Sequence, residues 1–360
     1  LVAPGPRVTK QMPGVPVSLP WASAIIAAPP SWRATTVSMP DTPANQKAYP
    51  QSNAQKPGLG FPIARMAVLI SLQCGAVLDM AIGPYQGKQT GETALFRRMW
   101  NHLQRGDIVL GDRHFGSFWH IAMLQQRGVD VIFRLHQQRS DDLRRGKRLG
   151  KYDRLVQWFK PEQRPDWMDR KTYAQLPNVI EVRLVKVTVN VPGFRVKSLT
   201  LVTTLTDPTA VSRAELAEVY RARWHGELDL RSIKCTMQMD VLRCKSPAMV
   251  RKEIWMHLLA YNLIRTVMAQ AAQAHGAQPR QISFTGALQT LEAFVEMMRF
   301  TRDADDWLRA YRALLQAIAH HRVGQRPNRC EPRAVKRRPK AIALLNVPRK
   351  QARYRLTKTT

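Results

Sequence analysis

Apolar residues in the first half of the chain recur with two periods, one typical of strands and one typical of helices. Short, mostly apolar runs predict strands at Thr35–Met39, Ile63–Leu72, Ala76–Ile82, Ile108–Leu110 and Val129–Leu135. Apolar residues at helical spacing predict helices at Thr90–Leu103 and Phe118–Arg127. Because a helix separates the last two strands, we expect them to be parallel. The pattern therefore predicts an α/β fold with a mixed five-stranded sheet and flanking helices.

The second half of the chain begins with a β-rich segment and continues with helices. Residues 137–178 are strongly basic without a regular period, and we expect them, like the polar residues 44–60, to be irregular. Within residues 179–206, two alternating runs flank Pro192-Gly193 and predict a pair of strands. We expect these strands to belong to a β-rich insertion ahead of the main helices. Helices are predicted to begin at Ser212, where Ser212 and Glu215 match a capping box, and to lie around Met249–Ala272 and Thr285–His320.

The two ends of the chain differ in composition from the rest. Residues 1–34 hold many prolines, no acidic residue and no regular apolar period, so we expect them to be mostly disordered. Residues 321–360 are basic and contain prolines, which predicts a mobile tail. We therefore assign the folded domain to residues 35–320. Because the chain begins with Leu1 rather than Met, we expect a fragment or an atypical start.

The balance of charge indicates a polyanionic partner. The 360 residues include 56 Lys and Arg against 26 Asp and Glu, which gives a formal net charge of +30. Double-stranded DNA is the partner that we expect, because many cationic contacts with phosphates release counterions. We expect no membrane partner, since no apolar run approaches the roughly 20 residues that a span needs. Plain solubilising charge stays open as an alternative. The four cysteines lack zinc-site spacing, which is typical of reduced thiols in a cytoplasmic protein.

One predicted helix carries a pattern of chemically active residues. Tyr220, Arg223 and Lys234 stand at offsets of −7, −4 and +7 from Glu227. On a regular helix these four positions fall within roughly a third of the circumference, so one face presents a carboxylate, two cations and a phenol. A carboxylate can hold a divalent metal, and cations beside it can bind the phosphates around a scissile bond. The alternative is an exposed helix face with one ordinary Arg–Glu pair.

A second candidate carboxylate follows a predicted buried strand. Gly111 and Asp112 come directly after the apolar run Ile108–Leu110. The carboxyl end of a strand in an α/β sheet is a common place for a ligand site, so Asp112 is well placed to bind a metal. The alternative is that Asp112 caps the next helix.

The spacing Tyr-x2-Arg-x3-Glu-x6-Lys resembles the signature of the insertion sequence 4 family of bacterial DDE transposases, and all four residues match it. The similarity extends from about Thr35 to at least Arg265. The resemblance implies an RNase H-like catalytic domain whose carboxylates bind Mg²⁺, with Mn²⁺ as an alternative ion. It implies that Asp112 and Glu227 are catalytic metal ligands and that the other three signature residues bind DNA. It also implies a homodimer that holds transposon ends and target DNA, in the bacterial cytoplasm beside the nucleoid.

The first carboxylate of that family is missing from its expected place. In the family it belongs to an Asp-Gly motif of the first strand, whereas this chain has Arg33 there. A cation at this position would repel a divalent metal. Asp41 and Asp79 are weaker substitutes, because Asp41 lies in an expected turn and Asp79 lies in a strand that could neighbour the first. We hypothesise that the native N-terminal part has been lost or replaced.

Three functions are therefore compatible with the sequence. The first is an insertion-sequence transposase, which cleaves and transfers DNA strands. The second, favoured by Arg33, is a catalytically dead transposase remnant that still binds DNA. The third is an RNase H-like nuclease without strand transfer.

Overall fold

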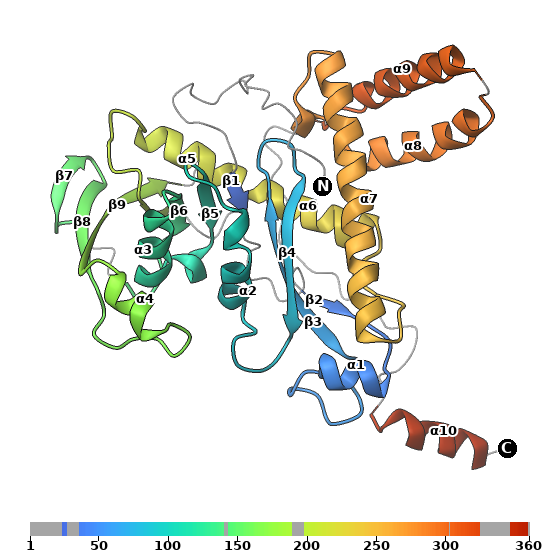
Figure 1. Cartoon of the computed structure of the whole chain (residues 1–360), viewed down its shortest axis with the longest axis horizontal. Helices are drawn as coiled ribbons and strands as arrows, with labels where there is room; N and C mark the ends of the chain where they lie inside the picture. Colours follow the sequence, from blue (N-terminus) through green and yellow to red (C-terminus); the bar gives the residue numbers. More distant parts are fainter. Residues whose placement is uncertain are drawn as a thin grey trace.

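The computed structural model describes residues 24–26, 36–139, 143–188, 198–301, 303–324 and 346–358. The predictions for Arg33 and for the turn at Pro192-Gly193 lie outside the described residues. Within them, strands and helices alternate along the chain, which confirms the predicted α/β class (Figure 1).

The strands of the described residues form two sheets. The three-stranded sheet has the order β2-β3-β4 and is antiparallel, with β2 (Thr36–Ser38), β3 (Ile63–Ile70) and β4 (Val77–Pro84). The seven-stranded sheet contains the parallel strands β1 (Ala24–Ile26), β5 (Ile108–Gly111) and β6 (Asp130–Arg134). Thus the predicted strands form, but they are divided between two sheets. Residues 24–26, within the segment that we expected to be mostly disordered, pair with the edge of β5 as a short strand.

The larger sheet continues into the β-rich insertion. Its order is β1-β5-β6-β10-β9-β8-β7, and the last four strands are β7 (Lys147–Gly150), β8 (Asp153–Phe159), β9 (Val179–Thr188) and β10 (Ser198–Thr203). The insertion precedes the helix that carries Glu227, as predicted. Residues 137–178 are not irregular, however: they contain β7, β8 and the helix α4 (Arg170–Gln175). Cationic side chains interrupt the apolar alternation there, and the order comes from pairing with β9 and from contacts such as Arg139 over the Trp158 ring.

Helices surround both sheets. The smaller ones are α1 (Pro43–Ala48), α2 (Glu92–Arg98), η1 (Trp100–His102) and α3 (Phe118–Gln126). The C-terminal ones are α7 (Pro247–Ala274), α8 (Phe284–Arg299), α9 (Ala304–His320) and α10 (Arg349–Lys358). Helix α1 lies in residues that we expected to be a loop, because Thr42 caps it and a proline fits its first turn. Helix α10 likewise gives order to part of the predicted mobile tail. Among the described helices, none has the length and apolar character of a membrane span.

In the part of the chain that the structure describes, three clusters of buried apolar residues hold these layers together. One packs α7, α8 and α9 against the three-stranded sheet. The other two lie on opposite faces of β5 and β6. Val109 and Phe133 face α2 and α3, whereas Leu110 and Ile132 face the helix α5 (Arg213–Ala222). This alternation decides toward which helices the side chains at the ends of β5 and β6 point.

A buried ion pair stabilises the insertion. The Arg183 side chain is fully buried on β9, and its guanidinium donates to Asp153 Oδ1 and Oδ2 on β8 at 2.9 and 2.6 Å. The same guanidinium donates to the carbonyl oxygens of Leu205 and Val211, in the segment that leads to α5. Asp153 balances the charge of Arg183, and the carbonyl oxygens accept its remaining hydrogen bonds. The pair therefore links the insertion to the segment before α5.

We predict that Gly111→Ala destabilises the fold. A Cβ at Gly111 would lie 2.8 Å from Phe133 Cδ1 and 3.1 Å from Phe115 Cδ2, so the two rings must shift. Overpacking of this kind costs about 1–3 kcal/mol of the free energy of unfolding, which urea denaturation measures. Gly91→Ala is the control, because a Cβ there meets nothing within 4 Å. Equal stability of the two variants would contradict the prediction.

Candidate active site

One nearly continuous helical rod carries the four signature residues. It consists of α5, α6 (Trp224–Arg231) and the π-helix η3 (Ser232–Thr236). The rod starts at the predicted capping box, in which Glu215 N donates to Ser212 Oγ and Ser212 N donates to Glu215 Oε2. Buried apolar residues of α5 then pack on the α5 face of the larger sheet. The sequence therefore predicted the rod correctly, except for its junction at Arg223 and its π-helical end.

Asp112 lies at the carboxyl end of β5 and is 8% exposed. Its Oδ1 accepts a hydrogen bond of 2.7 Å from the backbone N–H of Arg113 and so caps the short helix η2 (Arg113–Phe115). This geometry is compatible with both roles expected for Asp112, metal ligand and helix cap, because the cap uses only Oδ1. No hydrogen bond from another described residue reaches Oδ2, which leaves that oxygen available to a ligand.

Glu227, Arg223 and Tyr220 form a cluster beside Asp112. Arg223 Nη2 donates to Glu227 Oε1 at 3.1 Å, and the Arg223 guanidinium lies 5.6 Å from the centre of the Tyr220 ring. Burial raises the pKa of Glu227; Arg223 opposes this rise, and the charge of Asp112 adds to it. Burial also raises the pKa of Tyr220 to about 12, so its hydroxyl is neutral at pH 7 and can donate a hydrogen bond. The charge of Asp112 thus acts on Glu227, which indicates that the two carboxylates lie near each other.

Arg223 has more hydrogen-bond donors than partners. Its side chain is 15% exposed and pairs with Glu227 through Nη2. Its Nε and Nη1 are buried, and neither has a hydrogen-bond partner in the part of the chain that the structure describes. Buried cationic donors without an acceptor are costly. An anion beside Glu227, such as a phosphate, would satisfy them.

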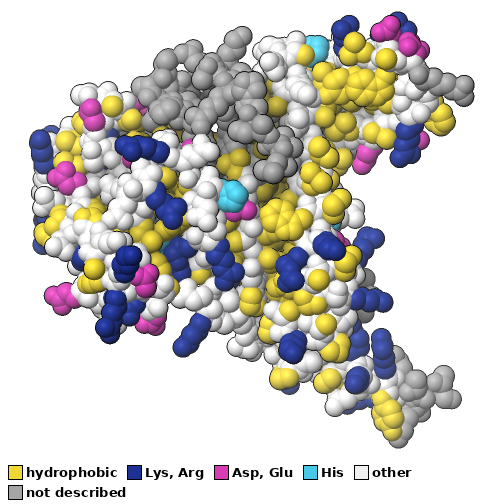
Figure 2. Space-filling model, viewed as in Figure 1, with side chains coloured by type: hydrophobic (Ala, Val, Ile, Leu, Met, Phe, Trp, Pro, Cys, Tyr) yellow, Lys and Arg dark blue, Asp and Glu magenta, His cyan; other side chains and the backbone are white. Residues whose placement is uncertain are grey.

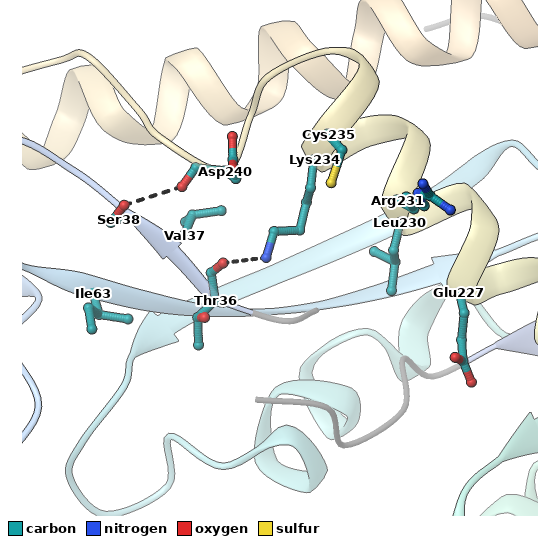
Figure 3. A pocket seen from close by; sticks show the side chains of 10 residues that line it. All are labelled: Thr36, Val37, Ser38, Ile63, Glu227, Leu230, Arg231, Lys234, Cys235 and Asp240. Carbon is teal, nitrogen blue, oxygen red and sulfur yellow. Dashed lines mark hydrogen bonds between the residues drawn. The ribbon is translucent and has the colours of Figure 1, made fainter. Parts of the chain in front are cut away.

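Lys234 lies on the other side of a hollow of about 480 Å³ that Glu227 also lines (Figure 3). Its Nζ donates to the backbone oxygen of Thr36 on β2 at 2.6 Å. Burial lowers the pKa of Lys234, whereas Asp240 opposes that change. The π-helical turn alters the helical phase between Glu227 and Lys234, so Lys234 does not join the cluster around Asp112 but points toward β2.

The structure places the two substitute carboxylates elsewhere. Asp79 on β4 lies 3.4 Å from His102, and Asp41 accepts a hydrogen bond from Gln46 in α1. Neither lines the hollow beside Glu227. The described residues contain no group of three or more His, Cys, Asp or Glu side chains arranged to hold a metal. Asp112 and Glu227 remain as a pair. Two carboxylates suit Mg²⁺, which usually completes its octahedron with water and substrate phosphate.

The sequence did not reveal the buried carboxylate of Asp229, two residues beyond Glu227. Asp229 is 1% exposed and accepts hydrogen bonds from Arg265 of α7 and from Arg280, whose Nη1 lies 2.7 Å from Oδ2. The Tyr261 hydroxyl lies 3.0 Å from Asp229 Oδ1. Two residues along a helix correspond to about 200°, so a helix that presents Glu227 to a site turns Asp229 toward the core. The helical phase could therefore have indicated that Asp229 is buried. It could not have identified the arginines that pair with Asp229, because they are distant in sequence.

The same network reaches the turn between β3 and β4. The Arg280 guanidinium donates to the carbonyl oxygens of Ser71 and Leu72, both at 2.9 Å. The Tyr261 hydroxyl lies 2.9 Å from the Gly75 carbonyl oxygen. Asp229 therefore joins α6, α7 and the smaller sheet behind the candidate site.

Comparisons with known proteins give a consistent result. The chain matches the family model described as the transposase DDE domain over residues 34–263. It is 28% identical over 309 residues to the transposase InsG for insertion sequence element IS4 of Escherichia coli strain K12, covering 83% of this chain. The chain spans 65% of the length of that relative. A piggyBac transposase synaptic complex with hairpin DNA has a TM-score of 0.39 and 8% identity, over 75% of this chain and 54% of that chain, a likeness too low to support an argument.

We predict that Asp229→Asn loosens α6. Breaking a buried ion pair costs about 3–5 kcal/mol of the free energy of unfolding, because the remaining cations stay buried. Hydrogen exchange measured by mass spectrometry should increase in residues 224–236. Asp153→Asn is a matched control, since it breaks the buried pair with Arg183 in the insertion. The same increase in residues 224–236 for the control would refute a specific role for Asp229.

Proposed function

The chain belongs to the transposase DDE domain family, and we propose that it is a DNA transposase of an insertion sequence, which cleaves and transfers DNA strands. One observation carries the proposal. Asp112, at the end of β5, and Glu227, on α6, lie near enough to interact, and the unsatisfied donors of Arg223 lie beside them. This combination supports the proposal, because it would bring ligands for a metal and donors for a phosphate to one place.

Each residue has a role that follows from its surroundings. Asp112 and Glu227 would hold a divalent metal, Mg²⁺ or Mn²⁺, which would supply charge neutralisation at the scissile phosphate. The free donors of Arg223 would bind a non-bridging phosphate oxygen, and the neutral Tyr220 hydroxyl would donate to the backbone. Lys234 lies farther along the hollow and would contact an adjacent phosphate.

The chemistry is a pair of substitutions at phosphorus. In cleavage, a water oxygen forms a bond to phosphorus while the 3′-oxygen leaves. In transfer, that 3′-hydroxyl attacks a phosphodiester of the second DNA strand, and another 3′-oxygen leaves. The protein contributes position and charge rather than a covalent intermediate.

Double-stranded DNA is the partner that fits this proposal. The formal net charge is +30. Figure 2 shows Lys and Arg side chains spread from the insertion across the lower part of one face toward α10, whereas hydrophobic side chains gather over α7, α8 and α9. Such a face suits a long phosphate backbone. We further propose that the chain acts as a homodimer, because two transposon ends must be held together for transfer.

The second candidate function is binding without cleavage. It is favoured by Arg33, which stands where the family's first Asp is expected. A third carboxylate would otherwise complete the metal site. A nuclease of the same fold, which cuts but does not join strands, is a further outcome that the same assay identifies.

We predict metal-dependent cleavage and joining of labelled duplexes that carry the repeats flanking the coding sequence. Asp112→Asn and Glu227→Gln should each lower the cleavage rate at least ~10²-fold while DNA binding persists, because both remove a metal ligand. Asp107→Asn, at the opposite end of β5, is the matched control. Binding without nicking would support the remnant, and nicking without joining would support the nuclease. Unchanged cleavage in both variants would overturn the site.

If the chain binds DNA without cutting it, Arg33→Asp should restore metal-dependent nicking. The substitution supplies the carboxylate that the family has at this position and removes a repelling cation. Arg33→Asn removes the cation alone and serves as the control. An equal increase in the nicking rate of both variants would show that charge repulsion, rather than a missing metal ligand, limits activity.

A further inference from the structure

Arg134 lies next to Asp112 at the same edge of the larger sheet. Strands β5 and β6 are parallel, and Gly111 pairs with Phe133, so the next pair along the strands is Asp112 and Arg134. Arg134 also pairs with Leu201 of β10, which keeps it within regular strand geometry. The two residues therefore stand on adjacent strands, about one strand spacing apart.

Both side chains point toward α5. Leu110 and Ile132 belong to the apolar cluster on the α5 face of the sheet, and Asp112 and Arg134 each come two residues later. Because side chains on a strand alternate, residues two apart share a face. Tyr220 of α5 belongs to the same cluster. The charges of Arg134 and Asp112 both act on the Tyr220 hydroxyl, which agrees with this placement.

Arg134 is half-buried and has no anionic partner in the described ranges. No ion pair or side-chain hydrogen bond joins it to Asp112 or to another described residue. The neighbouring Arg113 is used differently, since its guanidinium donates to Gln137 at 2.7 Å. Partial burial of a cation without an anion is unfavourable unless a ligand supplies the negative charge.

We propose that Arg134 is a phosphate-binding residue of this site, outside the four-residue signature. It binds the DNA backbone from the sheet side, whereas Arg223 binds it from the helix side. A planar guanidinium suits two phosphate oxygens at once. The inference rests on the proposed function for its substrate class, a DNA phosphodiester, but not on strand cleavage.

The test compares Arg134→Gln with Arg309→Gln in the full chain. Arg309 is an exposed residue of α9, and its loss changes the net charge equally. Binding of a labelled duplex is measured against salt concentration. Loss of one phosphate contact lowers the slope of log K against log salt by about 0.9 for Arg134→Gln, while the control slope stays at the wild-type value. In a cleaving chain, the rate at saturating DNA also falls by about 10²-fold.

Arg134→Lys adds a second measurement. Lysine keeps the charge but loses the planar fork, so it should restore the salt slope while the cleavage rate stays below the wild-type rate. If thermal denaturation shows that Arg134→Gln folds poorly, Arg134→Lys provides the test in its place. The inference is overturned if Arg134→Gln matches Arg309→Gln in slope and rate. A chain that never cleaves DNA would defeat the proposed transposase activity, yet the slope would still decide the role of Arg134.

Discussion

The buried carboxylate of Asp229 fixes the helix on which the candidate site depends. A carboxylate in a protein interior must be neutralised, and here Arg265 and Arg280 do so from two other elements. The helix α6 cannot rotate or slide without separating these charges. Because Glu227 stands on the opposite side of the same helix, the network that holds Asp229 in the core also holds Glu227 toward Asp112.

The charged groups on the Glu227 side of α6 are arranged differently from those around Asp229. The charges around Asp229 are balanced within the protein. On the other side of α6, Nε and Nη1 of Arg223 have no acceptor among the described residues, and the half-buried Arg134 forms no ion pair with them. Two carboxylates and a neutral phenol complete the surface. The protein alone thus satisfies the charges on one side of the helix, whereas the proposed metal and phosphate backbone would complete the other side. The contrast separates the residues that build the fold from those proposed to contact the substrate.

Much of this arrangement followed from the sequence, because strong local patterns agree with the fold. The hairpin of β3 and β4, the strand β5 and the capped start of α5 are where the apolar period and the capping box placed them. Strands β7 and β8 were missed because cationic residues hide their alternation and distant pairing supplies their order. The π-turn at Ser232–Thr236 was missed because nothing local distinguishes it from an α-helix. The partners of Asp229 come from α7 and beyond, which no spacing rule connects.

The pairing of β5 with β6 has a consequence for how the chain reaches its native state. A shift of β6 by one residue against β5 would turn its side chains to the other face. Arg134 would then enter the apolar layer beneath α2 and α3, and Phe133 would face α5. A chain with that shift would bury an uncompensated cation among apolar side chains, which is unfavourable. Arg134, proposed to bind phosphate, therefore also disfavours a one-residue shift between β5 and β6.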